Sequence, residues 1–370
     1  MKKIFAGLLC LLIANLSKAT IHIVSNLPGV TANFTNLTDA TTAAASGDTI
    51  YVQPSATTYA NFQYFDKKII FLGAGFRPEK DMGLTSVING LSMGDAASVA
   101  GSPNGSSFDG LVFTNIVDVA YSFNGSLGIS NLTFRRCEFK SGVSSSSLRL
   151  GSGAIQSLSN ILIESCYFNN SSIGLGGPST VLSNMIVRNC YFRESNNSRY
   201  FDNFSSVSSI VIEHNLFFSA STRDFSTTDT KFLLLSNNVF INVNFIAGAL
   251  TNSTFNNNIS FGGTASPWLN DANIDGGGNI ANQDPQLTDM AAILINANNP
   301  LHDFSITSGP ANNSGSDGKD MGLLFDAATS TNWTFARNAL LPYIKTLNIL
   351  NPTLAPGGTL NVKIEAKAAQ

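Results

Sequence analysis

Charged side chains are scarce in this chain of 370 residues, at 12% of the total against about 25% in an average soluble domain. The formal net charge is −3, and lysine and arginine form no dense run. A nucleic-acid-binding protein needs a basic surface for the phosphates, so this class of partner is not expected. Because 43% of the residues are hydrophobic, there is enough apolar material for a core, and disorder is not expected either.

Long hydrophobic runs are missing apart from one at the N-terminus. Residues 1–19 read MKKIFAGLLCLLIANLSKA, in which two lysines precede an apolar run and a Ser-Lys-Ala sequence follows it. This pattern is typical of a secretory signal peptide cleaved after Ala19, and the run is too short to span a bilayer. The GLLC sequence ending at Cys10 is a poor lipid-attachment motif, so no lipid anchor is expected. We therefore expect a secreted protein, extracellular or periplasmic, without a membrane span.

Cysteine is also rare, and three cysteines remain after removal of the signal peptide: Cys137, Cys166 and Cys190. An odd number cannot pair completely within one chain, although a disulfide between two of them stays open. Their spacings of 29 and 24 residues match no zinc motif, and no histidine cluster accompanies them, so no metal site is predicted. The spacings instead indicate a repeat.

Short segments across the chain share one pattern: apolar, any, apolar, any, any, Cys or Asn, any, Phe. The copies are LTFRRCEF (132–139), ILIESCYF (161–168), MIVRNCYF (185–192), IVIEHNLF (210–217) and LLLSNNVF (233–240), with a weaker STFNNNIS (253–260) and an earlier LVFTNIVD (111–118). We call the Cys or Asn place the ladder position, and the alignment assigns it to Ile116, Cys137, Cys166, Cys190, Asn215, Asn238 and Asn258. The intervals of 20 to 29 residues are typical of one repeat unit per coil of a solenoid.

Alternation of apolar and polar residues with period two indicates short strands, and no helix-forming segment lies between them. The sequence therefore predicts an all-β, single-stranded parallel β-helix in which successive coils lie about 4.8 Å apart. Five phenylalanines of the repeat should form an internal stack: Phe139, Phe168, Phe192, Phe217 and Phe240. The cysteines are interpreted as small buried apolar residues, and the asparagines as partners for backbone amides at a turn.

Charges alternate at one outward position of the repeat, in the order Arg135, Glu164, Arg188, Glu213. Each charge would lie between opposite charges on the neighbouring coils, which fixes the register of the strands. We interpret this column as structural, and not as a row of catalytic residues.

The ends of such a solenoid have to be covered. We predict an N-terminal cap at 20–47, with a helix from an N-cap at Thr38 through Ala45 that stops at Gly47. The β-helix should follow at 48–330, and 331–370 should form a small C-terminal β appendage.

The segments NLPGVTANFTNLTDATTAAASGDTIYVQPS (26–55) and KKIIFLGAGF (67–76), together with DFSITSGPANNSGSDGKDMGLL (303–324) near the far end, carry a resemblance. They resemble secreted right-handed parallel β-helix proteins of the pectate-lyase-like superfamily, over roughly residues 22–330. The closing coil departs slightly from the usual Ser-Pro-Ala-x-Asn-x-Gly run. The resemblance implies a right-handed coil but no single function, because members include lyases, hydrolases, adhesins and phage fibres.

Catalytic signals are weak. The repeat strands carry no pair of aspartates, and His22, His214 and His302 are scattered. A hydrolase of this kind would need two or three carboxylates, and the resemblance implies a carboxylate-bound Ca²⁺ with an arginine or lysine base for a lyase. The weak candidates for a catalytic site are Arg199, Asp202, Arg223 and Asp224, with Arg149 two coils earlier. Solvated turns with local ion pairs explain the same cluster.

Candidate carbohydrate-binding residues are Tyr167, Tyr191, Arg193 and Tyr200. Tyr167 and Tyr191 follow the ladder position in adjacent coils and should face outward, stacked about 4.8 Å apart, as a platform for a sugar ring. Ordinary cross-strand stacking is an equally good interpretation.

The leading hypothesis is a secreted, monomeric β-helix protein that binds an extracellular polysaccharide or a cell-surface glycan without catalysis and without a cofactor. The alternative is a polysaccharide lyase or glycoside hydrolase that acts on an acidic polysaccharide, with Ca²⁺ as cofactor if it is a lyase. A structural or adhesin element is the third.

Overall fold

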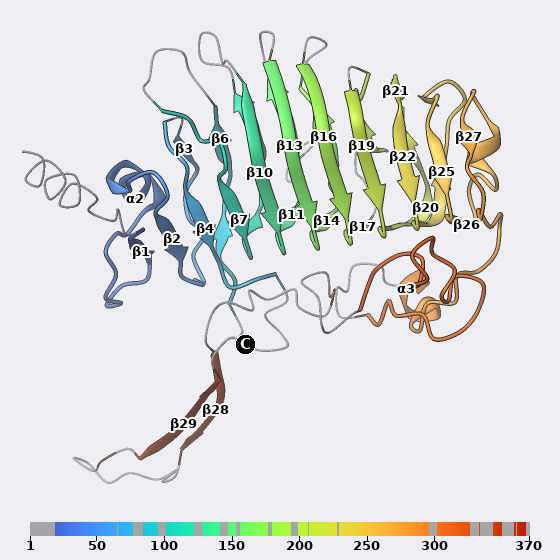
Figure 1. The fold of residues 1–370 in the computed structure, drawn as a ribbon. Helices are drawn as coiled ribbons and strands as arrows, with labels where there is room; N and C mark the ends of the chain where they lie inside the picture. The colour runs from blue at the N-terminus through green and yellow to red at the C-terminus, as the bar shows by residue number, and fades with distance from the viewer. Residues whose placement is uncertain are drawn as a thin grey trace, which may run out of the picture.

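The computed structural model of the chain describes residues 19–64, 66–76, 84–94, 101–121, 128–140, 147–152, 156–176, 180–193, 199–205, 207–227, 229–295, 302–325, 333, 343–349, 359 and 361–367. Except for Ala19, the expected signal peptide lies outside these residues. The fold is an all-β solenoid of parallel strands, as predicted (Figure 1). Its right-handed winding, taken from the resemblance, stays a prediction, as do the domain boundaries.

One side of the solenoid is an 11-stranded parallel sheet, which we call the long sheet. Its strands are β1 (Ile21–Val24), β2 (Thr49–Val52), β4 (Ile70–Leu72), β7 (Ser107–Asp109), β10 (Ile129–Arg135), β13 (Gln156–Glu164), β16 (Thr180–Arg188), β19 (Val207–Glu213), β22 (Leu233–Ser236), β25 (Thr254–Asn256) and β27 (Ile274–Asp275). Figure 1 shows them side by side along the solenoid axis.

The other strands of the coils form two runs joined at one long strand, β20 (Leu216–Ser226). The corner run follows the long sheet directly and contains β5 (Val87–Ile88), β8 (Val112–Phe113), β11 (Glu138–Lys140), β14 (Tyr167–Asn169), β17 (Tyr191–Arg193), β23 (Val239–Asn244) and β26 (Ile259–Phe261). The far run contains β3 (Phe62–Tyr64), β6 (Leu91–Met93), β9 (Val117–Tyr121), β12 (Leu148–Ser152), β15 (Ile173–Leu175) and β18 (Arg199–Asp202). A parallel pair joins β21 (Thr230–Lys231) to β24 (Leu250–Thr251).

The N-terminal helix α2 spans Leu37–Ala43 and covers the first coils. Its N-cap is Asn36, so the predicted cap at Thr38 is wrong. Asn36 has an extended backbone, and its side chain accepts a hydrogen bond from the Asp39 amide at 2.8 Å, whereas Thr38 already lies in the first turn. The helix ends before Ala45, whose amide donates to the Asp48 carboxylate at 2.8 Å.

Short elements complete the chain. They are a 3-10 turn at Pro267–Leu269, the helix α3 (Met290–Ile295) and an antiparallel hairpin of β28 (Tyr343–Ile349) and β29 (Val362–Lys367), which agrees with the predicted C-terminal β appendage. Within the part of the chain that the structure describes, no helix has the length and apolar character needed to cross a bilayer.

The predicted aromatic stack is confirmed inside the solenoid. The rings of Phe139, Phe168, Phe192, Phe217 and Phe240 follow one another with centroid distances of 4.4 to 5.2 Å and nearly parallel planes. A second internal stack, which the sequence analysis did not identify, joins Phe71, Phe108 and Phe134 at 5.0 and 4.9 Å. Both stacks place one aromatic ring per coil in the core, so each coil is held to the next by apolar contact as well as by the backbone.

The ladder position is confirmed as a buried column, but its first member is assigned wrongly and its last member is missing from the sequence alignment. The three cysteines are free and buried, and each thiol donates to the carbonyl oxygen two residues earlier. The earliest assignment, Ile116, is wrong: Val112 pairs with Glu138 and Phe113 with Phe139, which puts Leu111 in the column. The segment 106–113 is therefore the repeat unit of that coil.

The asparagine part of the ladder also continues beyond Asn258, since Asn279 belongs to it. The side chain of Asn258 accepts from the amide of Asn238, and that of Asn279 accepts from the amide of Asn258, at 3.0 and 2.9 Å. Each asparagine side chain also donates to a backbone carbonyl of the preceding coil, as Asn238 does to Ile212 at 2.8 Å. The ladder thus satisfies backbone groups that the turn leaves without strand partners.

A second column lies one residue before the ladder position, where the backbone turns from the long sheet into the corner run. These residues have φ between 47° and 57°: Arg136, Ser165, Asn189, His214, Asn237 and Asn257. Asparagine tolerates this left-handed conformation better than most residues, which explains its frequency at the corner. We call this set the corner column.

The predicted alternation of charge is confirmed by the strand register, since Arg135, Glu164, Arg188 and Glu213 are partners on successive strands. Glu164 is fully buried between the two arginines, and each guanidinium lies 2.6 Å from its carboxylate. This column is a network of ion pairs that connects three coils, as expected for a register-fixing role.

A C-terminal stretch, residues 287–295 and 302–325 with Trp333, packs against the outer face of the corner run, and we call it the cover segment. Its apolar residues, including Met290, Phe304, Met321 and Trp333, form one buried cluster with the outward side chains of the corner run. Because this cluster is separate from the core inside the coils, the solenoid has a second hydrophobic core on its outer surface.

Polar contacts tie the cover segment to the corner column. The amide of Leu324 donates to Asn189 Oδ1 and the amide of Ser316 to Asn237 Oδ1, both at 2.8 Å. His214 Nε2 lies 3.3 Å from Asp317 Oδ2. Burial lowers the pKa of His214, and the carboxylates of Asp317 and Glu213 raise it in part without reversing the shift.

We expect Asn238→Ala to lower the free energy of unfolding by about 2–4 kcal/mol, because it leaves the buried Asn215 amide and Ile212 carbonyl without partners. Urea unfolding followed by circular dichroism measures the change. The exposed Ser208→Ala should stay within about 0.5 kcal/mol of the parent chain. An Asn238 variant as stable as this control would contradict the structural role of the ladder.

The cover segment should loosen in acid. Burial favours the neutral form of His214, so its pKa is lower in the folded chain than in the unfolded chain, where it is about 6.5. The stability that this gives is fully present above pH 6.5 and is lost as the pH falls through the pKa of the folded chain. We expect the melting temperature to fall between about pH 7 and pH 5. His214→Asn, which suits the left-handed corner, should flatten this dependence, and an unchanged slope would show that His214 does not cause it.

Candidate functional site

The far run presents a column of polar side chains to the outside of the solenoid. In β3, β6, β9, β12 and β15 the second residue lies between two apolar residues that point inward, as Asp118 does between the buried Val117 and Val119. The strand register places these second residues, and one residue of β18, over one another. We call this set the polar column: Gln63, Ser92, Asp118, Arg149, Gly174 and Asp202.

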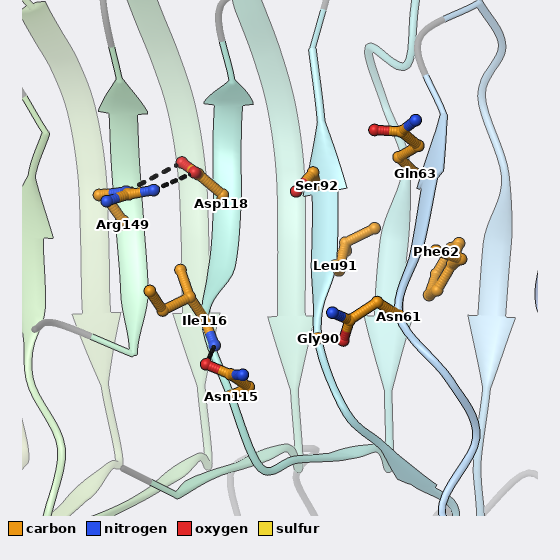
Figure 2. A pocket seen from close by; sticks show the side chains of 10 residues that line it. All are labelled: Asn61, Phe62, Gln63, Gly90, Leu91, Ser92, Asn115, Ile116, Asp118 and Arg149. Carbon is orange, nitrogen blue, oxygen red and sulfur yellow. Dashed lines mark hydrogen bonds and ion pairs between the residues drawn. The ribbon is translucent and has the colours of Figure 1, made fainter. Parts of the chain in front are cut away.

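The first four coils of the polar column border a hollow of about 340 Å³. Figure 2 shows its lining, which combines residues of the strands with residues that precede them: Asn61, Phe62, Gln63, Gly90, Leu91, Ser92, Asn115, Ile116, Asp118 and Arg149. Asn61 and Gln63 are exposed, and Ser92 and Asn115 are half-buried. The hollow is therefore an open site with amide and hydroxyl groups, not a closed apolar cavity.

Gly90 allows Ile116 and Asn61 to lie close to the backbone at the floor of the hollow. A Cβ atom at this position would lie 2.9 Å from the carbonyl oxygen of Ile116 and 3.0 Å from Oδ1 of Asn61. Any other residue would push these groups apart, so the narrow spacing between the neighbouring coils depends on glycine here.

Asp118 and Arg149 form the charged end of the hollow (Figure 2). The guanidinium binds the carboxylate through two nitrogens: Nε lies 3.2 Å from Oδ1, and Nη2 makes the second contact, to Oδ2. Asp118 is only 3% exposed, whereas the Arg149 side chain is 33% exposed. The bidentate pair fixes the plane of the guanidinium, and it balances the charge of the buried carboxylate.

The candidate catalytic residues lie further along the same side of the solenoid. Asp202 belongs to the polar column, and Gly174 separates it from Arg149. Arg199 Nη2 lies 2.8 Å from the Asp202 carboxylate, and its Nη1 donates to Thr227 Oγ1 at 2.8 Å. The structure thus brings Arg149 and Asp202 into one column and pairs Arg199 with Asp202.

Asp224 and Arg223, on β20, complete the candidate set. Asp224 is the strand partner of Arg199, and Arg223 the partner of Val243. Burial raises the pKa of Asp224, and a hydrogen bond from Asn244 and the charge of Arg223 oppose that rise. A raised carboxyl pKa is a property of general acids, but the Asp224 carboxyl interacts with Asn244 and Arg223 and not, among the described residues, with a second carboxylate.

The exposed tyrosine platform expected from the sequence is wrong in one respect. Tyr167 and Tyr191 do lie outside the coil and stack, with centroids 5.1 Å apart and planes within 3°. They are, however, buried beneath the cover segment, where Tyr191 also contacts Phe304 and Trp333. Neither ring offers a face to a sugar while the cover segment is in place.

The other two candidate carbohydrate-binding residues are also turned to internal contacts. Tyr200 is fully buried inside the solenoid, and its hydroxyl donates to the carbonyl of Phe218 at 2.9 Å. Arg193 is half-buried on the corner run and donates to Asn169 Oδ1 at 2.6 Å. Neither residue borders the hollow.

Asp118, Gln63 and Ser92 were missed in the sequence analysis, although a signal existed. Each is the middle residue of an apolar–polar–apolar triplet: FQY (62–64), LSM (91–93) and VDV (117–119), followed by LRL (148–150). The intervals of the triplets vary with the loops between them, so the column becomes visible only after the coils have been aligned.

The lining of the hollow offers hydrogen-bonding groups and few ionisable ones. Its lining contains one carboxylate, Asp118, and that group is engaged by Arg149. Glycoside hydrolysis by an acid and a base needs a second carboxylate about 5–9.5 Å away, which the lining does not supply. Across the described residues, no three His, Cys, Asp or Glu side chains are grouped so as to hold a metal ion.

Comparison of the chain with protein-family models finds no matching family, and comparison with curated proteins finds no significant match. The likeness to secreted β-helix proteins therefore rests on the sequence segments alone, and the solenoid fold does not by itself select a function.

We expect Arg149→Ala to lower the free energy of unfolding by about 2–3 kcal/mol, because it leaves the buried Asp118 carboxylate without its ion-pair partner. The loss is smaller than for a fully buried pair, since the Arg149 side chain is partly exposed. Adding Asp118→Asn to this variant should recover about half of the loss. Lys231→Ala, which breaks the more exposed pair with Asp229, should cost less than about 1 kcal/mol. Equal losses in both single variants would contradict this assignment.

Proposed function

We propose that the chain is an exported carbohydrate-binding protein, and that it holds a neutral polysaccharide along the polar column. The observation that carries this proposal is the hollow in which Gln63, Ser92 and the Asp118–Arg149 pair stand in register. Amide, hydroxyl and guanidinium groups are the partners that sugar hydroxyls use in proteins.

The spacing of the column supports an extended polymer as ligand. Successive side chains lie on strands about 4.8 Å apart, which is close to the length of one sugar ring in an extended chain. A polymer aligned with the solenoid axis would therefore meet one polar residue per sugar ring. Gly174 leaves the column open between Arg149 and Asp202 for a longer ligand.

The charge of the site supports a neutral ligand. Arg149 is neutralised by Asp118, and Arg199 is paired with Asp202. The whole chain carries a net charge of −3, so an acidic polymer would gain little long-range attraction. The N-terminal pattern of residues 1–19 supports export, which would bring the site into contact with extracellular polysaccharides.

A lyase or hydrolase is the second candidate, because Asp224 is the strand partner of Arg199 and follows Arg223, and burial raises the pKa of its carboxyl as in a general acid. If this cluster is catalytic, incubation with acidic polysaccharides should release reducing ends or unsaturated products. Asp224→Asn should then abolish the release without weakening binding at the hollow.

We expect Gln63→Ala and Ser92→Ala each to weaken binding about 5-fold, and the double variant about 20-fold or more, since each change removes one hydrogen-bonding group from the hollow. A glycan array with neutral and acidic polysaccharides, followed by titration calorimetry, measures this. Ser208→Ala on the long sheet is the matched control, because it removes an exposed hydroxyl elsewhere. Absence of binding to every polysaccharide, or equal losses in the control, would favour a structural or adhesin role.

A further inference from the structure

Phe232 is an anomaly on the outer face of the long sheet. It has φ of +60° and is 54% exposed. The equivalent places on other coils, also in the left-handed conformation, are Asn131, Asn160, Asn184, Ser209 and Asn252. A bulky aromatic side chain in this backbone region is strained, and its exposure costs further free energy, so neither property is explained by the fold of the single chain.

Phe232 adjoins an apolar column on the same face. Leu162, Ile186, Val211 and Leu234 point outward on four successive strands and are strand partners in register. Ile186 is 36% and Leu234 38% exposed. The column begins and ends at threonines, Thr133 on β10 and Thr254 on β25, so it has a defined length of four coils.

The apolar column lies under a hollow and between two columns of polar residues. A hollow of about 470 Å³ lies over the middle of the column and is lined by Asn160, Ile161, Leu162, Asn184, Ile186, Arg188, Ser209 and Val211. On one side, Asn184 donates to Asn160 and Asn160 to Asn131, at 3.3 and 3.1 Å. On the other side stands the charged column of Arg135, Glu164, Arg188 and Glu213.

We propose that this face of the long sheet is an interface between two copies of the chain. The two copies are related by a two-fold axis that runs along the strands, between β16 and β19. This symmetry places Ile186 over Val211 of the second copy and Leu162 over its Leu234. All four apolar residues of the column are then paired, and none is left facing a polar residue.

Charge complementarity supports the same axis. It places Arg188 opposite Glu213 of the second copy, and Glu213 opposite Arg188. Within one chain the buried Glu164 takes both Arg135 and Arg188 as partners, and among the described residues Glu213 forms no ion pair of its own. A two-fold axis between Arg188 and Glu213 reverses the order of the alternating column in the second copy. Each of these two charges then faces its opposite, so the column is complementary to its own copy.

The same two-fold axis gives Phe232 a contact, because it places the ring over Asn160 of the second copy and beside Leu162 of that copy. Aromatic residues, phenylalanine included, are enriched at protein–protein interfaces relative to the rest of the surface. A glycan or an unrelated protein would account for the apolar face, but it would not account for the match between β16 and β19.

The size of the face suits a weak dimer. Six strands, β10 to β25, are exchanged in pairs by this axis and span about 29 Å along the solenoid, and seven residues span about 23 Å along a strand. The interface would therefore bury about 1,300 Å² in total, near the lower end of the range for specific association. The polar column lies on a different run of strands, so the dimer leaves the hollow open, and the proposal does not depend on the proposed function. It replaces the monomer that the sequence analysis predicts.

The test is the oligomeric state of the full chain, measured by sedimentation velocity and light scattering from about 1 to 500 µM, a range that covers weak dimers. We expect a monomer–dimer equilibrium in the micromolar range. Phe232→Asn should weaken the dimer about tenfold or more and raise or preserve the melting temperature, because asparagine suits the left-handed backbone. Val211→Asp and Glu213→Arg should also dissociate the dimer.

Leu269→Asp is the matched control, since Leu269 is exposed but lies on the 3-10 turn away from this face, and its dimer should equal that of the parent chain. Circular dichroism verifies that each variant is folded. A parent chain that stays monomeric over the whole range would overturn the proposal. A dimer that is unaffected by Phe232→Asn and Val211→Asp would overturn it as well, and so would open-ended assemblies, which require a contact without two-fold symmetry.

Discussion

The constraint on which this protein depends is the hydrogen bonding of each coil to the coils before and after it. Parallel strands in register place equivalent residues of successive coils directly over one another, so that every position of the repeat becomes a column along the solenoid. A side chain is therefore tolerated only if it can lie next to its own kind or next to a matching partner. Phenylalanine stacks on phenylalanine, asparagine bonds to asparagine, and Arg188 lies on Glu164. The corner column permits this arrangement, because the backbone must turn at the same place in every coil.

The same constraint explains how much of the fold could be predicted. Period-two alternation and the recurring Cys or Asn identify the strands and the ladder without any knowledge of the loops. The error at Ile116 arose because LVF (111–113) imitates the start of the repeat, whereas it occupies the place of CEF (137–139). The stacking of Phe108 on Phe134 decides between these alignments, and it requires coordinates. Asn279 escaped notice because the glycines at 276–278 lengthen the last turn by one residue relative to its neighbour.

The candidate site shows where sequence reasoning stops. The polar column is a local property, since every member except Asp202 stands between two apolar residues of a short strand, and careful alignment of the coils predicts it. The burial of Tyr167 and Tyr191 is not local. It depends on Phe304 and Trp333, which are more than 100 residues away and follow no repeat. The outward position of the tyrosines could be predicted from the period, but the layer that covers them could not.

The burial of the three ladder thiols has a consequence for the export that we propose, since an exported chain enters an oxidising compartment. Burial raises the pKa of Cys137 and Cys166 well above that of a free thiol, which disfavours the reactive thiolate at these two positions. All three thiols, Cys190 included, are also buried, and exchange with other disulfides needs access to the sulfur. An odd number of cysteines is then harmless once the middle coils have closed. The vulnerable period is the time before closure, when an exposed thiol could still be captured in a mixed disulfide.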